Sequence, residues 1–132
     1  MYVWTKDLET GNIMIDTQHK QLIQAINNLL EACAKGQGRI QIDETLNFLN
    51  DYISSHFKDE EMLQKKYEYP DYINHKQYHE GFKKVVKEIV EEYNKGGATI
   101  ILVGKVNKSI GEWLINHIKR EDKKVAQHIK NK

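Results

Sequence analysis

The segment ISSHFKDEEMLQKKYEYPDYINHKQYH, residues 53–79, carries two pairs of ionisable side chains on either side of the chain's single proline. His56 is followed four residues later by Glu60, and His75 is followed four residues later by His79. Residues four apart lie on the same face of a helix, with Cβ atoms about 5–6 Å apart. A proline ends one helix and can begin the next. The segment therefore predicts two consecutive helices, each presenting a pair of metal-binding side chains to one side.

The remainder of the chain has the same helical organisation. Glycines and the proline divide it into an arm over residues 1–16 and four long segments. Within each segment the apolar or histidine positions recur every three or four residues, which places them on one face of a helix. Four amphipathic helices joined by short loops favour an all-α, antiparallel up-down-up-down four-helix bundle with an N-terminal arm. The expected helices span about 17–35, 41–66, 71–95 and 99–130.

Composition bounds the class of protein. The chain has 132 residues and a mass of 15.5 kDa, the size of one domain, so residues 1–132 are expected to form a single domain. Hydrophobic residues make up 39% and charged residues 30%, which excludes a disordered chain. The net charge of +1 argues against nucleic acid or an anionic membrane as the main partner. A balanced surface also favours a monomer.

Further features of the sequence exclude some kinds of site and indicate a cellular location. A single cysteine, Cys33, excludes an internal disulfide and a metal site made of thiolates. The longest apolar run, residues 100–103, is far shorter than the roughly 20 residues that span a bilayer. The N-terminus lacks the basic start and apolar stretch of a signal peptide. A soluble cytoplasmic protein is therefore expected.

The predicted core is unusual, because the inward faces of the four helices contain ionisable residues. One histidine on an apolar face is typical of a hydrogen-bonded core residue. Here every helix brings at least one imidazole, and a buried carboxylate accompanies them; such groups are costly to bury without a partner. A cation removes that cost. The inward set comprises His19, His56, Glu60, His75, His79 and His117.

The donor types indicate the metal. Imidazole and carboxylate without sulfur suit iron, zinc, copper or manganese, and five histidines exceed what one tetrahedral zinc can use. Two ions are therefore expected. The ferritin-like pattern needs Glu-x-x-His motifs, and the sequence has none. A second carboxylate is expected near His117. Ideal helix geometry favours Glu121, at i+4, over Asp122, at i+5 and ~140° round the helix, but the residues alone leave both open.

Five motifs are spread along the chain: Ile15-Asp16-x-x-His19, His56-Phe57-x-x-Glu60-Glu61, Tyr69-Pro70, His75-x-x-x-His79 and Trp113-Leu114-x-x-His117-Ile118-x-x-x-Asp122. In these motifs the sequence resembles a known family, the hemerythrins, and in particular the single-domain bacterial members. The resemblance runs from the Trp4 arm to Asp122, nearly the whole chain.

The resemblance implies a non-haem site of two iron ions, bridged by an oxo or hydroxo group, that binds O₂ reversibly. By the same resemblance, one iron is bound by His75, His79 and His117, and the other by His19 and His56. Glu60 and Asp122 bridge the two, so the family selects Asp122 over Glu121. Placing Asp122 on the site predicts a locally widened, π-type turn after His117. The iron with two histidines keeps one open position for O₂ or another small diatomic or anionic ligand.

The resemblance also implies an apolar pocket that keeps water from the bound ligand. Its expected lining is Leu22, Phe57, Trp113, Leu114 and Ile118, which would also serve as ordinary core residues. The expected function is oxygen storage, transport or delivery, with no catalytic residue. The alternatives are a di-iron oxidase or peroxidase that consumes O₂, and an O₂ or redox sensor. Five neutral imidazoles with only two carboxylates favour carriage. The sixth histidine, His128, is expected at the surface or at a frayed helix end.

Overall fold

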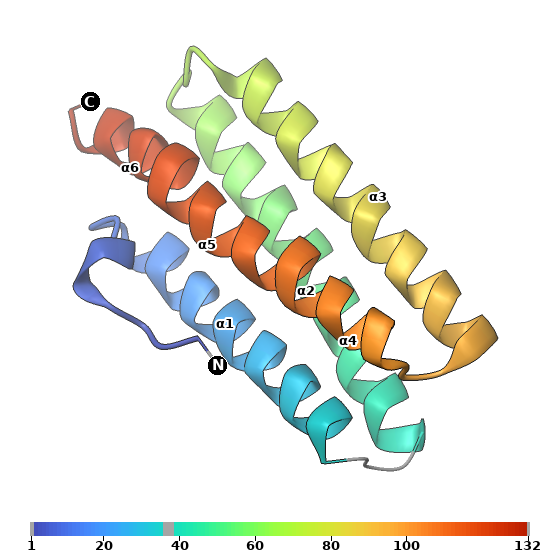
Figure 1. The fold of residues 1–132 in the computed structure, drawn as a ribbon. Helices are drawn as coiled ribbons and strands as arrows, with labels where there is room; N and C mark the ends of the chain where they lie inside the picture. The colour runs from blue at the N-terminus through green and yellow to red at the C-terminus, as the bar shows by residue number, and fades with distance from the viewer. Residues whose placement is uncertain (1, 36–38, 132) are drawn as a thin grey trace.

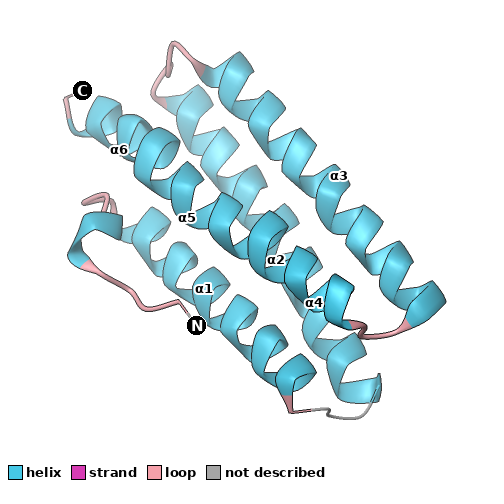
Figure 2. Ribbon diagram, viewed as in Figure 1, coloured by secondary structure: helices cyan, strands magenta, loops and turns pink. Residues whose placement is uncertain are grey.

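The structure is a computed structural model and describes residues 2–35 and 39–131. Three long helices, α1, α2 and α3, are followed by a final helix over residues 100–130 (Figure 1). The final helix is continuous but changes its winding, so that α-helical segments alternate with two π-helical ones. Within the described residues all regular structure is helical (Figure 2). The bounds are η1 Lys6–Leu8, α1 Ile13–Ala34, α2 Arg39–Lys66, α3 Tyr72–Gly96, α4 Ile100–Lys105, η2 Val106–Glu112, α5 Trp113–His117, η3 Ile118–Asp122 and α6 Lys123–Lys130.

The helices α1, α2, α3 and the final helix form the four rods of the bundle. They lie side by side and successive rods run in opposite directions, which confirms the predicted four-helix bundle (Figure 1). Short connections force this arrangement, because each helix must turn back along its predecessor to bury its apolar face. The α1 helix begins at Ile13, earlier than the expected residue 17. The side chain of Asn12 caps it by accepting a hydrogen bond from the Ile15 amide at 3.0 Å. In the same way Thr99 caps α4, accepting from Leu102 N at 3.1 Å.

The N-terminal arm binds across α1 to the final helix. The backbone N–H of Tyr2 donates to Asn27 Oδ1 at 2.9 Å, and its hydroxyl lies 2.8 Å from Asn107 Oδ1. A side chain at Gly111 would overlap the Tyr2 ring. Gly111 lies in the π-helical segment η2, so the glycine leaves the space into which the arm packs. Further along the arm, Leu8 is buried in the core.

The core runs along the bundle axis and is interrupted by polar side chains at one level. Apolar residues from all four rods make up most of it, among them Leu22, Ile26, Leu49, Ile53, Phe57, Phe82, Val86, Ile110, Leu114 and Ile118. Among the residues whose burial is described, eight polar or charged ones are also buried: His19, His56, Glu60, Gln64, His75, His79, His117 and Asp122. Such groups are seldom buried unless paired, so this layer marks the functional part of the molecule.

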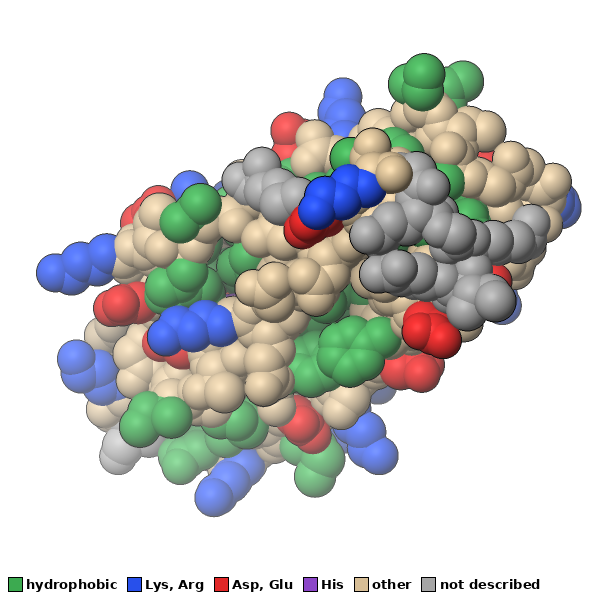
Figure 3. Space-filling model, turned by 90° about the horizontal axis from the view of Figure 1, so that it is seen from below, with side chains coloured by type: hydrophobic (Ala, Val, Ile, Leu, Met, Phe, Trp, Pro, Cys, Tyr) green, Lys and Arg blue, Asp and Glu red, His purple; other side chains and the backbone are tan. Residues whose placement is uncertain are grey.

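The surface is mixed in character. On the face seen in Figure 3, acidic and basic side chains are interspersed with exposed hydrophobic ones. Ile100 and Ile101 are 93% and 72% exposed. Over residues 2–35 and 39–131, no helix combines the length and the apolar composition that a membrane crossing requires.

Candidate metal centre

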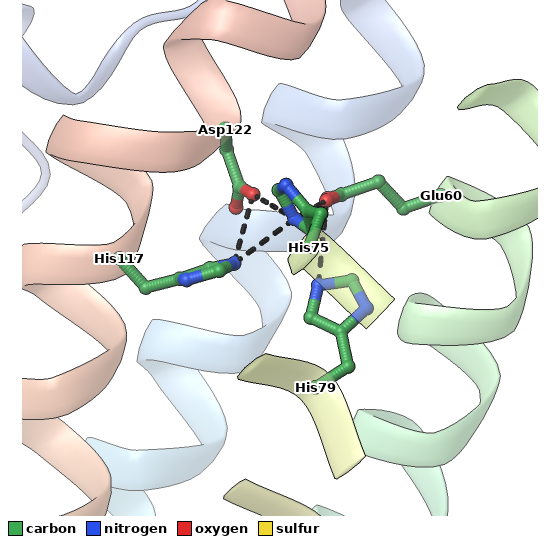
Figure 4. A group of neighbouring side chains, drawn as sticks. All are labelled: Glu60, His75, His79, His117 and Asp122. Carbon is green, nitrogen blue, oxygen red and sulfur yellow. Dashed lines mark hydrogen bonds and ion pairs between the residues drawn. The ribbon is translucent and has the colours of Figure 1, made fainter. Parts of the chain in front are cut away.

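Each rod of the bundle supplies side chains to one buried centre. His19 comes from α1, and α2 supplies a histidine and a glutamate one turn apart. The α3 helix supplies two histidines one turn apart, and the final helix supplies His117 and Asp122. Five of these side chains are drawn in Figure 4, where they converge from three rods. His117 is the most exposed of the seven, at 5%. The structure thus brings together all seven residues of the expected ligand set.

The seven residues form two overlapping groups that share both carboxylates. Within each group, one potential ligand atom from every residue lies within 4.8 Å of the others. One group has three histidines and the other has two. We call them the three-histidine group, Glu60, His75, His79, His117 and Asp122, and the two-histidine group, His19, His56, Glu60 and Asp122.

The Glu60 carboxylate lies between the two groups. Its Oε1 is 2.7 Å from His75 Nε2 and 3.5 Å from His79 Nε2. Its Oε2 is 3.3 Å from His56 Nε2 and 3.8 Å from His19 Nε2. Each oxygen therefore faces a different group, which is the orientation of a bridging carboxylate.

Asp122 has the same orientation from the opposite side. Its Oδ1 is 3.1 Å from the Nε2 atoms of both His75 and His117, and its Oδ2 is 2.8 Å from His19 Nε2. The chain over Ile118–Asp122 is a π-helix, which confirms the predicted widened turn. The Glu121 carboxylate instead points away, with its Oε2 3.7 Å from Lys124 Nζ. Of the two carboxylates that the residues left open, the structure places Asp122 at the centre.

Hydrogen bonds on the outer side of two imidazoles orient their inner nitrogens. His56 Nδ1 is 2.7 Å from Gln18 Oε1, and His79 Nδ1 is 2.8 Å from Glu61 Oε2. Because these oxygens are acceptors, each Nδ1 carries the proton and each Nε2 turns a lone pair inward. This is the arrangement in which a histidine binds a metal ion.

Several buried atoms at the centre lie close to one another but do not have the geometry of a hydrogen bond. They are His19 Nε2, His56 Nε2, His79 Nε2, Glu60 Oε2 and both oxygens of Asp122. Buried polar atoms without partners are rare in folded proteins and are destabilising. A cation between these atoms would satisfy them and balance the two carboxylates. The donor set of imidazole and carboxylate therefore fits first-row transition-metal ions.

The same groups perturb one another's proton affinity when no ion is bound. Burial alone would lower the pKa of His19, but Asp122 and Glu60 raise it to about 9. Burial opposes protonation of His75 as well, yet the same two carboxylates raise its pKa to about 10. The imidazoles in turn hold the pKa of Glu60 well below its usual value, against the effect of burial. Protons on the histidines thus take the place of a cation.

The expected pocket residues pack close to the centre. Leu22, Leu114 and Ile118 are fully buried. The ring of Phe57 stacks on that of His79 with centroids 3.8 Å apart, and Trp113 stacks on His117 at 4.5 Å. Both aromatic residues thus contact the three-histidine group. Whether the five residues line a ligand pocket stays a prediction.

A surface cleft of about 270 Å³ lies over the outer side of His117. It is lined by Tyr78, Trp113, Asn116, His117, Arg120 and Glu121. Trp113 therefore contacts both His117 and this cleft.

Two features of the site were not predicted from the sequence, and one expectation was wrong. Glu61 belongs to a quoted motif and Gln18 directly precedes a ligand, but neither position by itself signals a hydrogen bond to an imidazole. His128 is not at a free surface: its Nε2 donates to the Tyr67 carbonyl oxygen at 2.7 Å, and its ring packs edge-on against Tyr69. It links α6 to the turn between α2 and α3.

Comparison with known proteins agrees with this geometry. Residues 10–129 match the family described as "Hemerythrin HHE cation binding domain". Bacteriohemerythrin of Stenotrophomonas maltophilia (strain R551-3) is 33% identical over 130 residues, covering 98% of this chain and 82% of the relative. Bacteriohemerythrin of Methylococcus capsulatus (strain Bath) is 31% identical, covering 93% and 92%. Myohemerythrin of Theromyzon tessulatum is 31% identical, covering 92% and 88%.

A solved structure shows the same fold. It is the crystal structure of a mutant protein with phenylalanine in place of a leucine, and it superimposes with a TM-score of 0.84 at 30% identity. The match covers 93% of this chain and 92% of the other. Together with the family match over most of the sequence, this likeness shows that the chain belongs to the hemerythrin family.

Proposed function

We propose that the protein binds O₂ reversibly at a non-haem centre of two iron ions, and that it stores, transports or delivers oxygen. The observation that carries the proposal is the pair of overlapping groups, one with three histidines and one with two, that share Glu60 and Asp122. Membership of the hemerythrin family supports the choice of iron and of O₂. Other small diatomic or anionic ligands would compete for the same position.

The seven side chains divide between the two ions. His75, His79 and His117 would hold one iron, His19 and His56 would hold the other, and the two carboxylates would contact both. The two-histidine ion has one protein ligand fewer, which leaves a position for an external ligand. When bound, the iron pair, with its oxo or hydroxo bridge, supplies the electrons that allow O₂ to be held and released.

The protein's own contribution is to hold the ions and exclude water. Leu22, Leu114 and Ile118 are fully buried, and Phe57 is 1% exposed. An apolar surrounding limits access of water and protons, which is what reversibility requires. The role is carriage rather than catalysis, since five imidazoles and two carboxylates make a less oxidising site than a carboxylate-rich one. We therefore assign no catalytic residue. A di-iron oxidase or peroxidase and an O₂ or redox sensor remain the competing hypotheses.

We also propose an oligomeric state, a class of partners and a cellular location for the protein. The near-neutral charge supports a monomer without nucleic acid or membrane partners. A cytoplasmic location belongs to the same proposal. Sedimentation of the iron-loaded protein tests the first of these, with a mass near 15.5 kDa as the expected result.

Iron stoichiometry tests the ligand assignment. The protein, loaded with Fe²⁺ without oxygen and freed of excess metal, is expected to keep two irons per chain. His117→Ala and His19→Ala each remove one imidazole from a different group and are expected to lower the retained iron. His128→Ala is the matched control, because this histidine bonds to a carbonyl oxygen outside the centre. Retention of two irons by both ligand variants would contradict the assignment.

A further inference from the structure

The two imidazoles with outer hydrogen bonds have acceptors of different charge. In the three-histidine group, His79 Nδ1 donates to a carboxylate oxygen of Glu61 at 2.8 Å. In the two-histidine group, His56 Nδ1 donates to the amide oxygen of Gln18 at 2.7 Å. The two hydrogen bonds are almost equal in length, so they differ mainly in the charge of the acceptor.

A second hydrogen bond fixes the amide of Gln18. Its Nε2 donates to Asp59 Oδ2 at 2.9 Å, so its oxygen must face His56. The charge of Asp59 therefore stays one side chain away from the imidazole. The other histidine of this group, His19, has a buried Nδ1 without a hydrogen-bond partner. Neither imidazole of the two-histidine group thus has a charged acceptor on its outer side.

This difference changes the imidazoles as ligands. A carboxylate draws the Nδ1 proton toward itself and increases the electron density at Nε2, so the imidazole becomes a stronger donor to a cation. A neutral amide does the same more weakly. The effect grows with the charge of the ion, so a carboxylate favours the ferric over the ferrous state.

We propose that Glu61 is a positioning residue which, through His79, strengthens the three-histidine site for its ion, while Gln18 and Asp59 keep the two-histidine site the weaker one. The inference rests on the two-ion centre of the proposed function. Its consequence is that the ion with the open position is the more easily lost and the harder to oxidise. The difference between the two ions therefore has two causes, the number of histidine ligands and the hydrogen bonds that these histidines make on their outer side.

Stepwise binding of Co²⁺ without oxygen tests the proposal, because this ion needs no redox reaction. Wild-type protein is expected to bind two ions in two steps. The Co²⁺-binding step that is lost in His19→Ala belongs to the two-histidine site. Glu61→Gln is expected to weaken the other, three-histidine step by about 10–100-fold, the usual effect of removing such an outer partner. Glu80→Gln is the matched control, since Glu80 lies on α3 at the surface and pairs with Lys83.

A charge exchange supplies the reciprocal test. Gln18→Glu combined with Asp59→Asn keeps the net charge and moves the carboxylate into contact with His56, and the new amide can donate to it. This double variant is expected to strengthen the two-histidine step. With iron bound, the midpoint potential is expected to rise in Glu61→Gln and to fall in the double variant. Circular dichroism checks that each variant is folded.

The outcomes separate this proposal from the proposed function. A wild-type protein that binds fewer than two ions contradicts the two-ion centre itself, and this assignment with it. Two ions in the wild type, with Glu61→Gln behaving as Glu80→Gln, overturns the role of Glu61 alone. Equal weakening of both steps in Glu61→Gln also overturns it, because general loosening of the bundle would have that effect.

Discussion

Asp122 and His117 lie five residues apart on the final helix, yet Asp122 Oδ1 is 3.1 Å from His117 Nε2. In a regular α-helix a residue at i+5 lies ~140° away from its partner. The π-helical segment Ile118–Asp122 widens the helix and brings both side chains to the same face. π-Bulges of this kind are frequent at functional sites, and here the bulge selects which of two neighbouring carboxylates enters the centre.

Neutral substitutions at these two carboxylates should therefore have different effects. Asp122→Asn removes an oxygen ligand that faces both groups and is expected to reduce retained metal below two ions per chain. Glu121→Gln changes a side chain that pairs with Lys124 and is expected to retain two ions. Metal analysis after removal of excess ion distinguishes them. Equal loss of metal in both variants would contradict the bridging role of Asp122.

The metal-free protein should lose stability as the pH rises above neutrality. The pKa values of His19 and His75 are raised to about 9 and about 10 in the folded protein, from about 6.5 in the unfolded chain. Their contribution to the free energy of unfolding is therefore complete below pH 6.5 and is lost as the pH rises through 9 to 10. The midpoint of thermal unfolding is expected to fall by about 5 °C or more between pH 7 and pH 10.

Bound metal should remove this dependence. A cation takes the place of the protons, so the loaded protein does not need protonated histidines and is expected to keep its unfolding temperature over the same pH range. Thermal unfolding followed by circular dichroism, with chelator or with metal, measures both. A metal-free protein equally stable at pH 7 and pH 10 would show that the histidines do not carry the protons.

Leu114→Ala should make the oxygenated protein oxidise faster. Leu114 is fully buried and lies one turn before His117, so its truncation opens space next to the centre. Truncating a buried leucine also destabilises a protein by about 2–5 kcal/mol. Leu29→Ala is the matched control, because Leu29 is equally buried and lies ~15 Å along α1 from His19. The rate of conversion to the ferric form under air is the readout. Equal rates in the two variants would remove Leu114 from the pocket.

The arm and the final helix should be coupled at Gly111. An alanine there gains about 1 kcal/mol in helix propensity but would overlap the Tyr2 ring. Gly111→Ala is therefore expected to destabilise the wild-type protein. In a Tyr2→Ala background, the same change is expected to be stabilising, because the obstruction is gone. Denaturant unfolding of the four proteins gives the coupling free energy. If Gly111→Ala has the same effect in both backgrounds, the arm does not pack there as described.

The sequence predicted the bundle and the histidines well, because both follow from local periodicity. Three- and four-residue spacing places His56 with Glu60 and His75 with His79 whatever the tertiary structure. Asp122 could not be chosen in this way, since a regular helix favours Glu121 and only the resemblance to hemerythrins selected the other.

Contacts between segments that are distant in the sequence could not be predicted from its local patterns. The hydrogen bonds of Gln18 and Glu61 depend on how α1, α2 and α3 pack together. His128 was expected at the surface or at a frayed helix end, because the sequence shows its distance from the centre along the helix but not the Tyr67 carbonyl beside it. Likewise, nothing in the sequence indicated that Tyr2 of the arm fills the space beside Gly111.

The most direct test of the account is repeated cycling of the ferrous, iron-loaded protein between O₂ and argon, followed by its visible spectrum. The account predicts an absorption band that forms only under O₂, disappears under argon, and returns over several cycles with two irons per chain still ferrous at the end. A band that never forms, or that decays at once to the ferric state while O₂ is steadily consumed, would contradict it and favour an oxidase or a redox sensor.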